Sequence, residues 1–321
     1  MRYIYTLFLL LIFSATVSAQ TKVCELAYIS SNKLYTATLH IIDTNLSNER
    51  EIEIGFKVRG LVWSPDGQYL ALSLATDAIT STLTIMDADG TNPHELIEVI
   101  SIGEVSWSPT GNLIAYLATD DGRAVHLISP DGSYQRRLDI ALTASDFAWS
   151  QDGKYLAVQA LDEERNSAIY LVSVEDENAK KVIDGGSAPA WTLDGQISFS
   201  GSGEVKILDP FSDNLESRTL LVSRTGAPVI WSKIQATEAI INDQGDIWLL
   251  KDENLQNLTN DSEDVLTVDW SSDENFIAYV YFSRSEDGSA VGVKMINLET
   301  DEIHLIHEDA DMLDWRVCSE D

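Results

Sequence analysis

The sequence predicts an all-β protein made of repeated four-stranded units, and three observations support this fold class. Tryptophan recurs at spacings of 44, 42, 42, 40, 39 and 45 residues along the 321-residue chain. The tryptophans are followed by turns such as Ser64-Pro65-Asp66-Gly67 and then by a strand of mainly apolar residues. No segment shows the 3.6-residue apolar period of a helix over a helical length. A four-stranded repeat of this length is typical of a β-propeller blade.

Residues 1–19 have the pattern of a secretory signal peptide. Arg2 gives the positively charged start, residues 7–13 form a short apolar run, and residues 17–19 fit a small-residue cleavage site. The apolar run is too short to span a bilayer, and no later segment approaches that length. We therefore expect an exported protein, periplasmic or extracellular, without a transmembrane segment. Residues 20–321 are expected to form a single propeller domain.

Each repeat is expected to supply four short strands. The first strand ends at the repeated tryptophan, whose place beside apolar residues indicates packing between blades rather than a sugar-binding array. The repeated tryptophans are Trp63, Trp107, Trp149, Trp191, Trp231, Trp270 and Trp315. After the turn, in which proline fixes φ and glycine relieves strain, comes a second strand such as residues 69–72. Residues 83–86 and 94–96 are a third and a fourth strand of the same unit.

These units resemble a known repeat. The form Trp-Ser-Pro-Asp-Gly-x-x-(Ile/Leu)-Ala, followed by an apolar strand and an Asp-x-Asp-Gly turn, is similar to the WD40-like repeat of TolB-type β-propellers. A related repeat occurs in propeller domains attached to prolyl-oligopeptidase-like peptidases. The resemblance covers nearly all of residues 20–321 and implies the fold, but it implies no particular activity because the repeat residues build blades. The sequence departs from TolB in having seven repeats rather than six and no room for its N-terminal α/β domain.

The two ends of the chain are predicted to share the seventh blade. Residues 26–30, 38–43 and 49–54 match a second, third and fourth strand that lack a tryptophan strand of their own. Trp315 ends a first strand that has no blade after it. Joining these segments closes the ring by hydrogen bonds and gives seven blades, with six or eight blades as the alternatives.

The two cysteines support this closure. In the aligned repeats, Cys318 falls on the position of Asp66 and Cys24 on that of Gln68, on either side of one turn. Such positions lie within the ~4.4–6.8 Å Cα separation that a disulfide needs, and export permits oxidation. We predict a Cys24–Cys318 disulfide that stabilises the fold by roughly 4–5 kcal/mol in the chain-entropy model. The alternative is two unrelated buried thiols.

The chain is strongly acidic. Lys and Arg number 21 against 52 for Asp and Glu, which gives a net charge of −31. Such a surface repels phosphate backbones and anionic lipids, so nucleic acid and anionic membranes are poor candidate partners. Proteins and polar or cationic ligands remain as partners, and we expect a monomer.

Motifs for catalysis or metal binding are not found. The five histidines form no His-Glu-x-x-His motif, and the spacing of His304 and His307 places them on opposite faces of an outer strand. The turn Asp87-Ala88-Asp89-Gly90 lacks the glycine and glutamate positions of an EF-hand. No nucleophile elbow and no phosphate-binding glycine loop occurs. We predict no metal and no cofactor, with calcium at acidic loops left open.

Acidic side chains concentrate in loops that should meet on one rim of the ring. These loops join second to third strands and connect consecutive blades. The predicted rim carboxylates are Asp120, Asp121, Asp162, Glu163, Glu164, Asp243, Asp264, Glu286, Asp287 and Asp309. A concave acidic rim attracts cations or a basic partner, whereas the alternative is that these loops are simply solvated. Asp269 and Asp314, beside the tryptophan strands, are expected to face the central channel.

The sequence therefore favours an exported, non-catalytic propeller that binds a protein or a polar or cationic ligand through its acidic rim. The alternative is a secreted hydrolase or lyase whose site, based on carboxylates or calcium, is assembled on the rim from several blades. Two or three carboxylates within ~5–9 Å in a pocket favour the enzyme. Scattered, exposed carboxylates favour binding.

Overall fold

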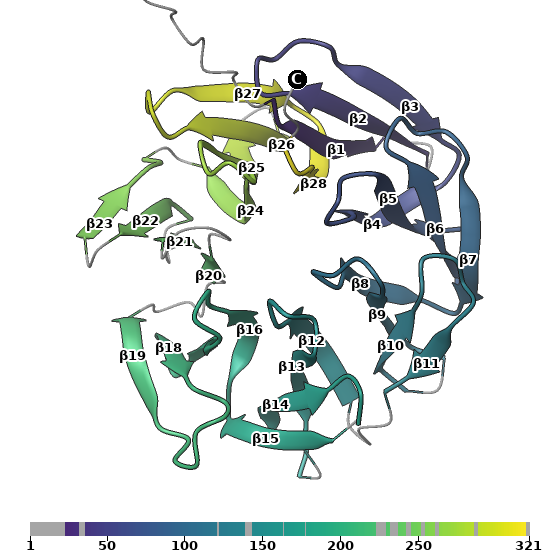
Figure 1. The fold of residues 1–321 in the computed structure, drawn as a ribbon. Coiled ribbons are helices and arrows are strands. Elements are labelled where there is room, and N and C mark those ends of the chain that lie inside the picture. Colours follow the sequence, from purple (N-terminus) through teal and green to yellow (C-terminus); the bar gives the residue numbers. More distant parts are fainter. Residues whose placement is uncertain are drawn as a thin grey trace, which may run out of the picture.

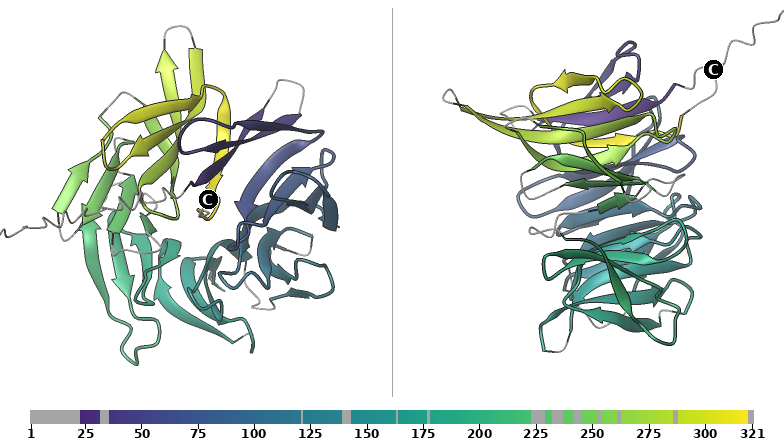
Figure 2. Two further views of the ribbon diagram at one scale, coloured as in Figure 1. Left: turned by 45° about the horizontal axis from the view of Figure 1, so that its top comes forward. Right: turned by 90° about the vertical axis from the view of Figure 1, so that its left-hand side faces the viewer.

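The computed structural model shows β-sheets arranged in a ring around a central axis (Figure 1). The structure describes residues 23–31, 36–120, 122–138, 143–162, 164–176, 178–222, 229–231, 237–241, 245–251, 254–260, 263–285 and 288–318. Seen edge-on, the ring is a flattened body (Figure 2). Within these ranges the chain forms seven four-stranded antiparallel sheets and no helix. The all-β propeller of four-stranded blades is confirmed.

Blades 1 to 3 follow one another along the first half of the chain. Blade 1 contains β4 (Lys57–Trp63), β5 (Tyr69–Ala75), β6 (Ser81–Asp87) and β7 (His94–Val99). Blade 2 contains β8 (Ile102–Trp107), β9 (Ile114–Ala118), β10 (Ala124–Ile128) and β11 (Gln135–Arg137). Blade 3 contains β12 (Thr143–Trp149), β13 (Tyr155–Leu161), β14 (Ser167–Ser173) and β15 (Ala179–Asp184).

Blades 4 to 6 continue the ring, and blade 7 combines both ends of the chain. Blade 4 contains β16 (Ser187–Trp191), β17 (Ile197–Gly201), β18 (Glu204–Leu208) and β19 (Ser217–Val222). Blade 5 contains β20 (Val229–Trp231), β21 (Thr237–Ile241), β22 (Ile247–Lys251) and β23 (Asn254–Asn257). Blade 6 contains β24 (Asp264–Trp270), β25 (Phe276–Ser285), β26 (Gly288–Asn297) and β27 (Ile303–His307). Blade 7 contains β28 (Ala310–Trp315), β1 (Glu25–Ser31), β2 (Ala37–Asp43) and β3 (Arg50–Ile54).

The turn after each first strand is built by local hydrogen bonds. In blade 1, Asp66 Oδ1 accepts hydrogen bonds from Ser64 Oγ at 2.6 Å and from the Gln68 backbone N–H at 3.0 Å. Gly67 has φ of 67°, a conformation that costs a residue with a Cβ more than it costs glycine. The Ser150–Lys154 and Ser271–Asn275 turns repeat the aspartate contacts. This recurrence explains why the turn signature could be read in the sequence.

The core lies between neighbouring blades, because both faces of each inner strand are covered. In β1, Leu26 and Tyr28 pack toward blade 6, whereas Ala27 and Ile29 pack toward blade 1. Successive side chains of a strand point to opposite faces, so a strand buried on both sides is apolar at consecutive positions. In three blades the indole ring adds a contact with the preceding blade, because its Nε1 donates a hydrogen bond to a backbone carbonyl there. These bonds are Trp149 Nε1 to Ser106 O at 3.3 Å, Trp191 Nε1 to Ala148 O at 3.0 Å, and Trp315 Nε1 to Asp269 O at 3.2 Å.

The ring closes where β28 pairs with β1. The two strands are antiparallel, with Leu26 opposite Trp315, and β2 and β3 complete the sheet (Figure 1). Arg316, just after β28, strengthens the junction with blade 1. Its Nε donates to Gly67 O at 2.7 Å, its guanidinium pairs with Glu25, and its Cζ lies 5.3 Å from the centre of the Trp63 ring. The strands from the two ends of the chain are thus held together within blade 7, and blade 7 is held to blade 1.

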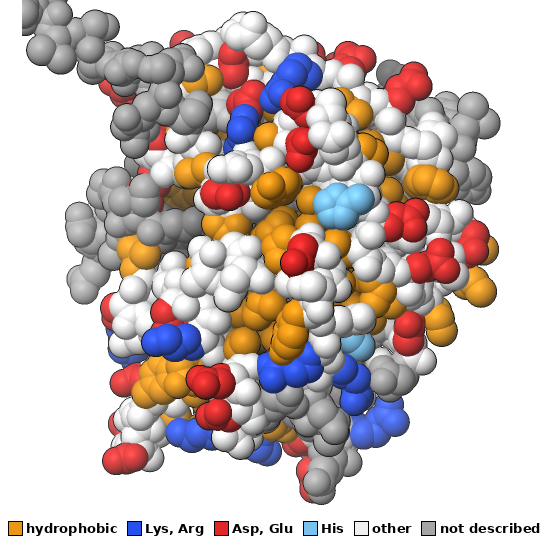
Figure 3. All heavy atoms as spheres, turned by 45° about the vertical axis from the view of Figure 1, so that its right-hand side comes forward, with side chains coloured by type: hydrophobic (Ala, Val, Ile, Leu, Met, Phe, Trp, Pro, Cys, Tyr) orange, Lys and Arg blue, Asp and Glu red, His pale blue; other side chains and the backbone are white. Residues whose placement is uncertain are grey.

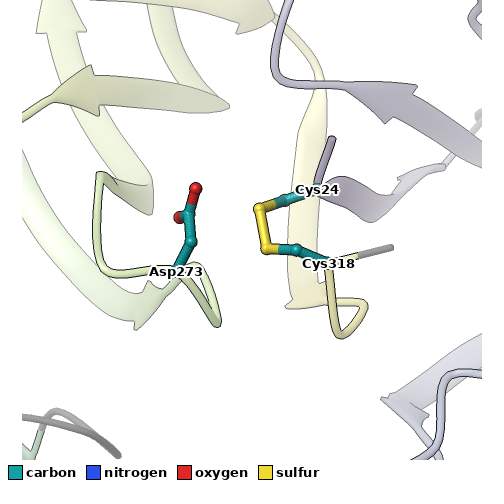
Figure 4. A group of neighbouring side chains, drawn as sticks. All are labelled: Cys24, Asp273 and Cys318. Carbon is teal, nitrogen blue, oxygen red and sulfur yellow. A yellow bond between two sulfur atoms is a disulfide. The ribbon is translucent and has the colours of Figure 1, made fainter. Parts of the chain in front are cut away.

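A disulfide lies beside this junction, in the pairing that the aligned repeats predict. Cys24 and Cys318 are joined, with their Cα atoms 4.1 Å apart and a separation of 294 positions in sequence. The Asp273 carboxylate, on the neighbouring blade 6 turn, points toward the two sulfur atoms (Figure 4). β1 also pairs with β2 from its other side, so this bond adds a covalent link between the start of β1 and the segment that follows β28.

Two further predictions from sequence have different outcomes. None of the segments that the structure describes forms a helix with the length and hydrophobicity needed to span a membrane. Residues 1–19 lie outside the described residues, so the signal peptide remains a prediction.

We expect that replacing both cysteines by serine (C24S/C318S) lowers the free energy of unfolding by about 2–5 kcal/mol, because the open chain gains conformational freedom. Denaturant unfolding of the oxidised protein and the double variant measures this difference. A reducing agent should destabilise the wild-type protein and leave the double variant unchanged. Equal stability of the two proteins would show that hydrogen bonding between β1 and β28 is sufficient for closure.

Candidate functional site

The first strands of the blades line a cavity of about 720 Å³ on the axis of the ring. Its wall consists of the ends of β4, β8, β12, β16, β24 and β28 together with the turns that follow them. Pro65, Pro109 and Gln151 come from these turns, and six of the repeated tryptophans contribute to the wall. Among the described residues that line the cavity, none is a lysine, arginine or histidine. The volume lies in the range of small-molecule and cofactor pockets.

Four carboxylates line this cavity: Glu104, Asp146, Asp269 and Asp314. Asp269 and Asp314 each precede a repeated tryptophan by one residue, which agrees with the expectation that they face the channel. Glu104 and Asp146 each precede one by three residues. The sequence analysis did not single out this second pair, although their equal spacing from Trp107 and Trp149 was a readable signal.

The cavity carboxylates also connect the blades. Each first strand is the inner edge of its sheet, so some of its backbone N–H groups face the axis without a neighbouring strand. Asp314 Oδ2 accepts a hydrogen bond from the N–H of Trp63 at 2.5 Å, and Asp269 Oδ2 accepts one from the N–H of Trp315 at 3.2 Å. Glu104 Oε2 accepts one from the N–H of Phe147 at 3.3 Å. In each case the carboxylate belongs to one blade and the N–H to the next.

Glu104 and Asp146 form a hydrogen-bonded pair of carboxyl groups from blades 2 and 3. Enclosure within the ring raises the pKa of Glu104 well above its usual range, and the adjacent charge of Asp146 raises it further. Enclosure also raises the pKa of Asp146. The raised pKa values favour one proton shared between the two carboxyl groups.

The predicted acidic rim is only partly described. Asp121, Glu163, Asp243, Glu286 and Asp287 lie outside the described residues. Asp120 Oδ1 accepts a hydrogen bond from the N–H of Ile100 at 2.6 Å, and Asp162 Oδ1 accepts one from the N–H of Asn166 at 2.8 Å. Glu164, Asp264 and Asp309 are exposed. None of the five described rim carboxylates belongs to a group of three potential metal ligands within 4.8 Å, and their binding role stays a prediction.

The surface agrees with the acidic composition. In the space-filling view, acidic side chains are spread over the face shown, basic ones gather toward its lower part, and apolar ones gather near its centre (Figure 3). No concentrated acidic patch stands out on this face.

A second polar cluster, which the sequence analysis missed, lies between blades 6 and 7. His40 stacks on Tyr28 with ring centres 4.6 Å apart, and His307 of β27 lies 5.2 Å from His40. Burial lowers the pKa of His40, and the neighbouring His307 lowers it further, whereas Glu49 opposes this effect. Burial and Glu49 raise the pKa of Tyr28. His307 does lie on an outer strand, as expected, but its contact with His40 links residues from opposite ends of the chain.

Comparison with known proteins establishes the fold only. No protein-family model matches the chain, and no curated protein matches it at a significant level. Among solved structures, TolB from Acinetobacter baumannii is 16% identical, with a TM-score of 0.58 over 91% of this chain and 82% of TolB. An oligogalacturonate lyase in complex with manganese is 12% identical, with a TM-score of 0.64 over 90% of this chain and 86% of the lyase.

A puromycin hydrolase is 15% identical, with a TM-score of 0.69 over 90% of this chain. The match covers 52% of the hydrolase, so this chain spans about half the length of that protein. At these identities the shared feature is the WD40-like β-propeller, which confirms the resemblance to the TolB-type fold. The names of these proteins include a hydrolase and a lyase, so the fold alone does not decide whether a site is catalytic.

We expect the difference in melting temperature between Glu104→Gln and wild type to grow in favour of the variant as the pH increases from 5 to 8. A carboxyl whose pKa is raised by folding contributes its full stability below the pKa of the unfolded chain, about 4.3 for Glu, and loses it as the pH rises through the folded pKa. The amide stays neutral and still donates to Asp146, so this loss is absent from the variant. Thermal unfolding across this pH range measures the effect.

The exposed Glu95→Gln is the matched control and should follow the wild-type pH profile. A constant difference between Glu104→Gln and wild type at every pH would contradict the shared proton.

Proposed function

We propose that this protein is an exported, non-catalytic β-propeller that binds a cationic partner, namely basic side chains of a protein or peptide, in its central cavity. The observation that carries the proposal is the composition of that cavity: four carboxylates and, among the described lining residues, no basic side chain. A cavity lined by one sign of charge focuses the electrostatic potential and attracts the opposite charge. The acidic rim, with its predicted carboxylates, would add to this attraction at longer range.

The wall of the cavity suits lysine or arginine side chains. Tryptophan and proline residues supply apolar surface near the turns, and the carboxylates lie beside them. Long basic side chains place their methylene stems along apolar surface while the charged head reaches a polar group. A guanidinium or ammonium group at the Glu104–Asp146 pair would find one ionised carboxylate and a second group able to lose its proton.

Two features support export. The Cys24–Cys318 bond belongs to a class that persists in oxidising compartments and is uncommon in the cytosol. Residues 1–19 carry the signal-peptide pattern. Both are consistent with a periplasmic or extracellular site of action.

The test is fluorescence anisotropy with labelled oligo-lysine and oligo-arginine peptides and an acidic peptide as the negative probe. We expect the basic peptides to bind and the double variant E104Q/D146N to weaken binding about tenfold or more, because hydrogen bonds to charged groups contribute roughly 1.5–3 kcal/mol. Raising the salt concentration should weaken binding.

The rim variant D120N/E164Q is the matched control, since it removes the same number of carboxylates from exposed positions. A much smaller loss of affinity in this variant than in E104Q/D146N supports the cavity as the site. Loss of binding only in the rim variant would move the site to the rim, and absence of binding to every basic peptide would overturn the proposal.

A second candidate function is favoured by the carboxyl pair. Two adjacent carboxyl groups with raised pKa values, which favour a shared proton, can supply an acid and a base in one cavity, as general acid–base catalysis requires. The solved structures that share the fold include a hydrolase and a lyase. This candidate is a secreted hydrolase or lyase with a carboxylate-based site in the cavity rather than on the rim.

Turnover assays separate the two candidates. The probes are oligogalacturonate, followed by formation of unsaturated product, and aminoacyl-p-nitroanilides, followed by release of nitroaniline. Under the binding proposal, wild type and E104Q show the same background rate. A wild-type rate that E104Q and D146N each reduce at least about a hundredfold, with a bell-shaped pH dependence, would establish the enzyme instead.

A further inference from the structure

A histidine and two glutamates meet on the outer part of blade 7, where it faces blade 6. His40 lies on β2, Glu51 lies opposite it on β3, and Glu49 comes just before β3. Glu49 and Glu51 are two residues apart in extended chain, so their side chains point to the same face. One ligand atom from each of these three side chains lies within 4.8 Å of the other two.

His40 is held in a fixed orientation. The residue is 5% exposed, and its ring stacks on Tyr28 with an angle of 1° between the ring planes. Ser30 Oγ lies 2.7 Å from Nε2, on the side of the ring away from the glutamates. Nδ1 faces Glu49 Oε1 at 3.2 Å. The ring therefore presents Nδ1 to the two carboxylates, and Ser30 can accept the ring proton on Nε2.

The two carboxylates have no basic partner among the residues that the structure describes. Glu49 accepts a hydrogen bond from the Tyr28 hydroxyl and approaches His40, and neither glutamate forms an ion pair with lysine or arginine. Arg50, which lies between them in sequence, points to the opposite face and donates to Glu25 Oε1 at 2.7 Å. The cluster thus presents two negative charges to a neutral imidazole, and a divalent cation would balance them.

We propose that His40 Nδ1, Glu49 and Glu51 bind one divalent transition-metal ion of the Zn²⁺ type. Zinc binds imidazole nitrogen and carboxylate oxygen at ~2.0–2.2 Å in tetrahedral geometry, so its ligand atoms lie about 3.3–3.6 Å from one another. The three ligand atoms here lie within 4.8 Å of one another, and rotation of the two exposed glutamate side chains would bring them to these separations. Calcium is the poorer fit because it takes six to eight oxygen ligands.

The surroundings complete the site. With a metal on Nδ1, the neutral ring carries its one proton on Nε2 and donates it to Ser30 Oγ, an outer contact of the kind that orients metal-bound histidines. The Tyr28 hydroxyl orients Glu49 in the same way. His307 forms a wall of the site rather than a ligand: its Nδ1 accepts a hydrogen bond from the N–H of Asp309 at 3.0 Å, so its other nitrogen carries the proton. Water would fill the remaining coordination position.

The proposed ion ties β2 to β3 in the blade that closes the ring. It would therefore stabilise the closed propeller, independently of the binding function proposed for the cavity. A ligand that binds only the folded state raises the melting temperature as its concentration increases.

The experiment uses the oxidised protein, stripped with EDTA and dialysed against ZnCl₂, with bound zinc measured by mass spectrometry and affinity measured by calorimetry. We expect one zinc per chain, a higher melting temperature with ZnCl₂, and no such effects with CaCl₂ at the same concentration. Glu49→Gln and Glu51→Gln should each weaken zinc affinity at least about tenfold, since even outer contacts of metal sites contribute this much. Both positions are exposed, so both variants should fold.

Glu302→Gln is the matched control. Glu302 Oε2 lies 3.8 Å from His304 Nε2, which makes an ordinary exposed His–Glu pair, and its loss should leave zinc binding unchanged. The cavity variant E104Q/D146N should also bind zinc as wild type does. Absence of stoichiometric zinc in the wild-type protein, or equal affinity in Glu49→Gln and Glu51→Gln, would overturn the proposal.

Discussion

The structure depends on the pairing of β28 with β1. This pairing builds blade 7 from both ends of the chain, and the closing pair joins residues almost 300 positions apart. Strand pairing, the Cys24–Cys318 bond and the Arg316 contacts act on the same junction, each through a different interaction. The conformational entropy cost of closing so long a loop arises only once. All other contacts between blades join successive repeats of ~45 residues each.

Closure has a consequence for the axis of the ring. It turns seven inner edge strands toward one another, and their unpaired N–H groups need acceptors in a region that neighbouring strands do not reach. Glu104, Asp269 and Asp314 supply such acceptors across the gaps between blades. Carboxylates are therefore gathered in the cavity for a structural reason. The same arrangement leaves the cavity negatively charged, so blade-to-blade bonding and affinity for cations arise from one set of side chains.

The outer part of blade 7 carries a polar cluster where it meets blade 6. Its polar cluster is formed by the terminal blade and by the last strand of blade 6, which are brought together only when the ring is complete. Tyr28 of β1 and His40 of β2 are directly paired, at positions where burial alone would favour apolar side chains. Two aromatic rings, a serine and two glutamates instead surround His40 with polar contacts. This composition is what supports the metal site proposed there.

The sequence by itself determined the blade, the closure and the pairing of the cysteines, because each follows from a repeat of nearly constant length. Once residues 26–54 and Trp315 are aligned with complete repeats, strand order and the Cys24–Cys318 contact follow by position. The tertiary structure alone decided which polar groups meet. Asp146 and Glu104 both lie where the pairing of the first and second strands shifts register, and His40 of blade 7 meets His307 of blade 6. Register shifts and the packing angle between sheets depend on the whole ring, so the spacing of the repeats along the sequence does not predict them.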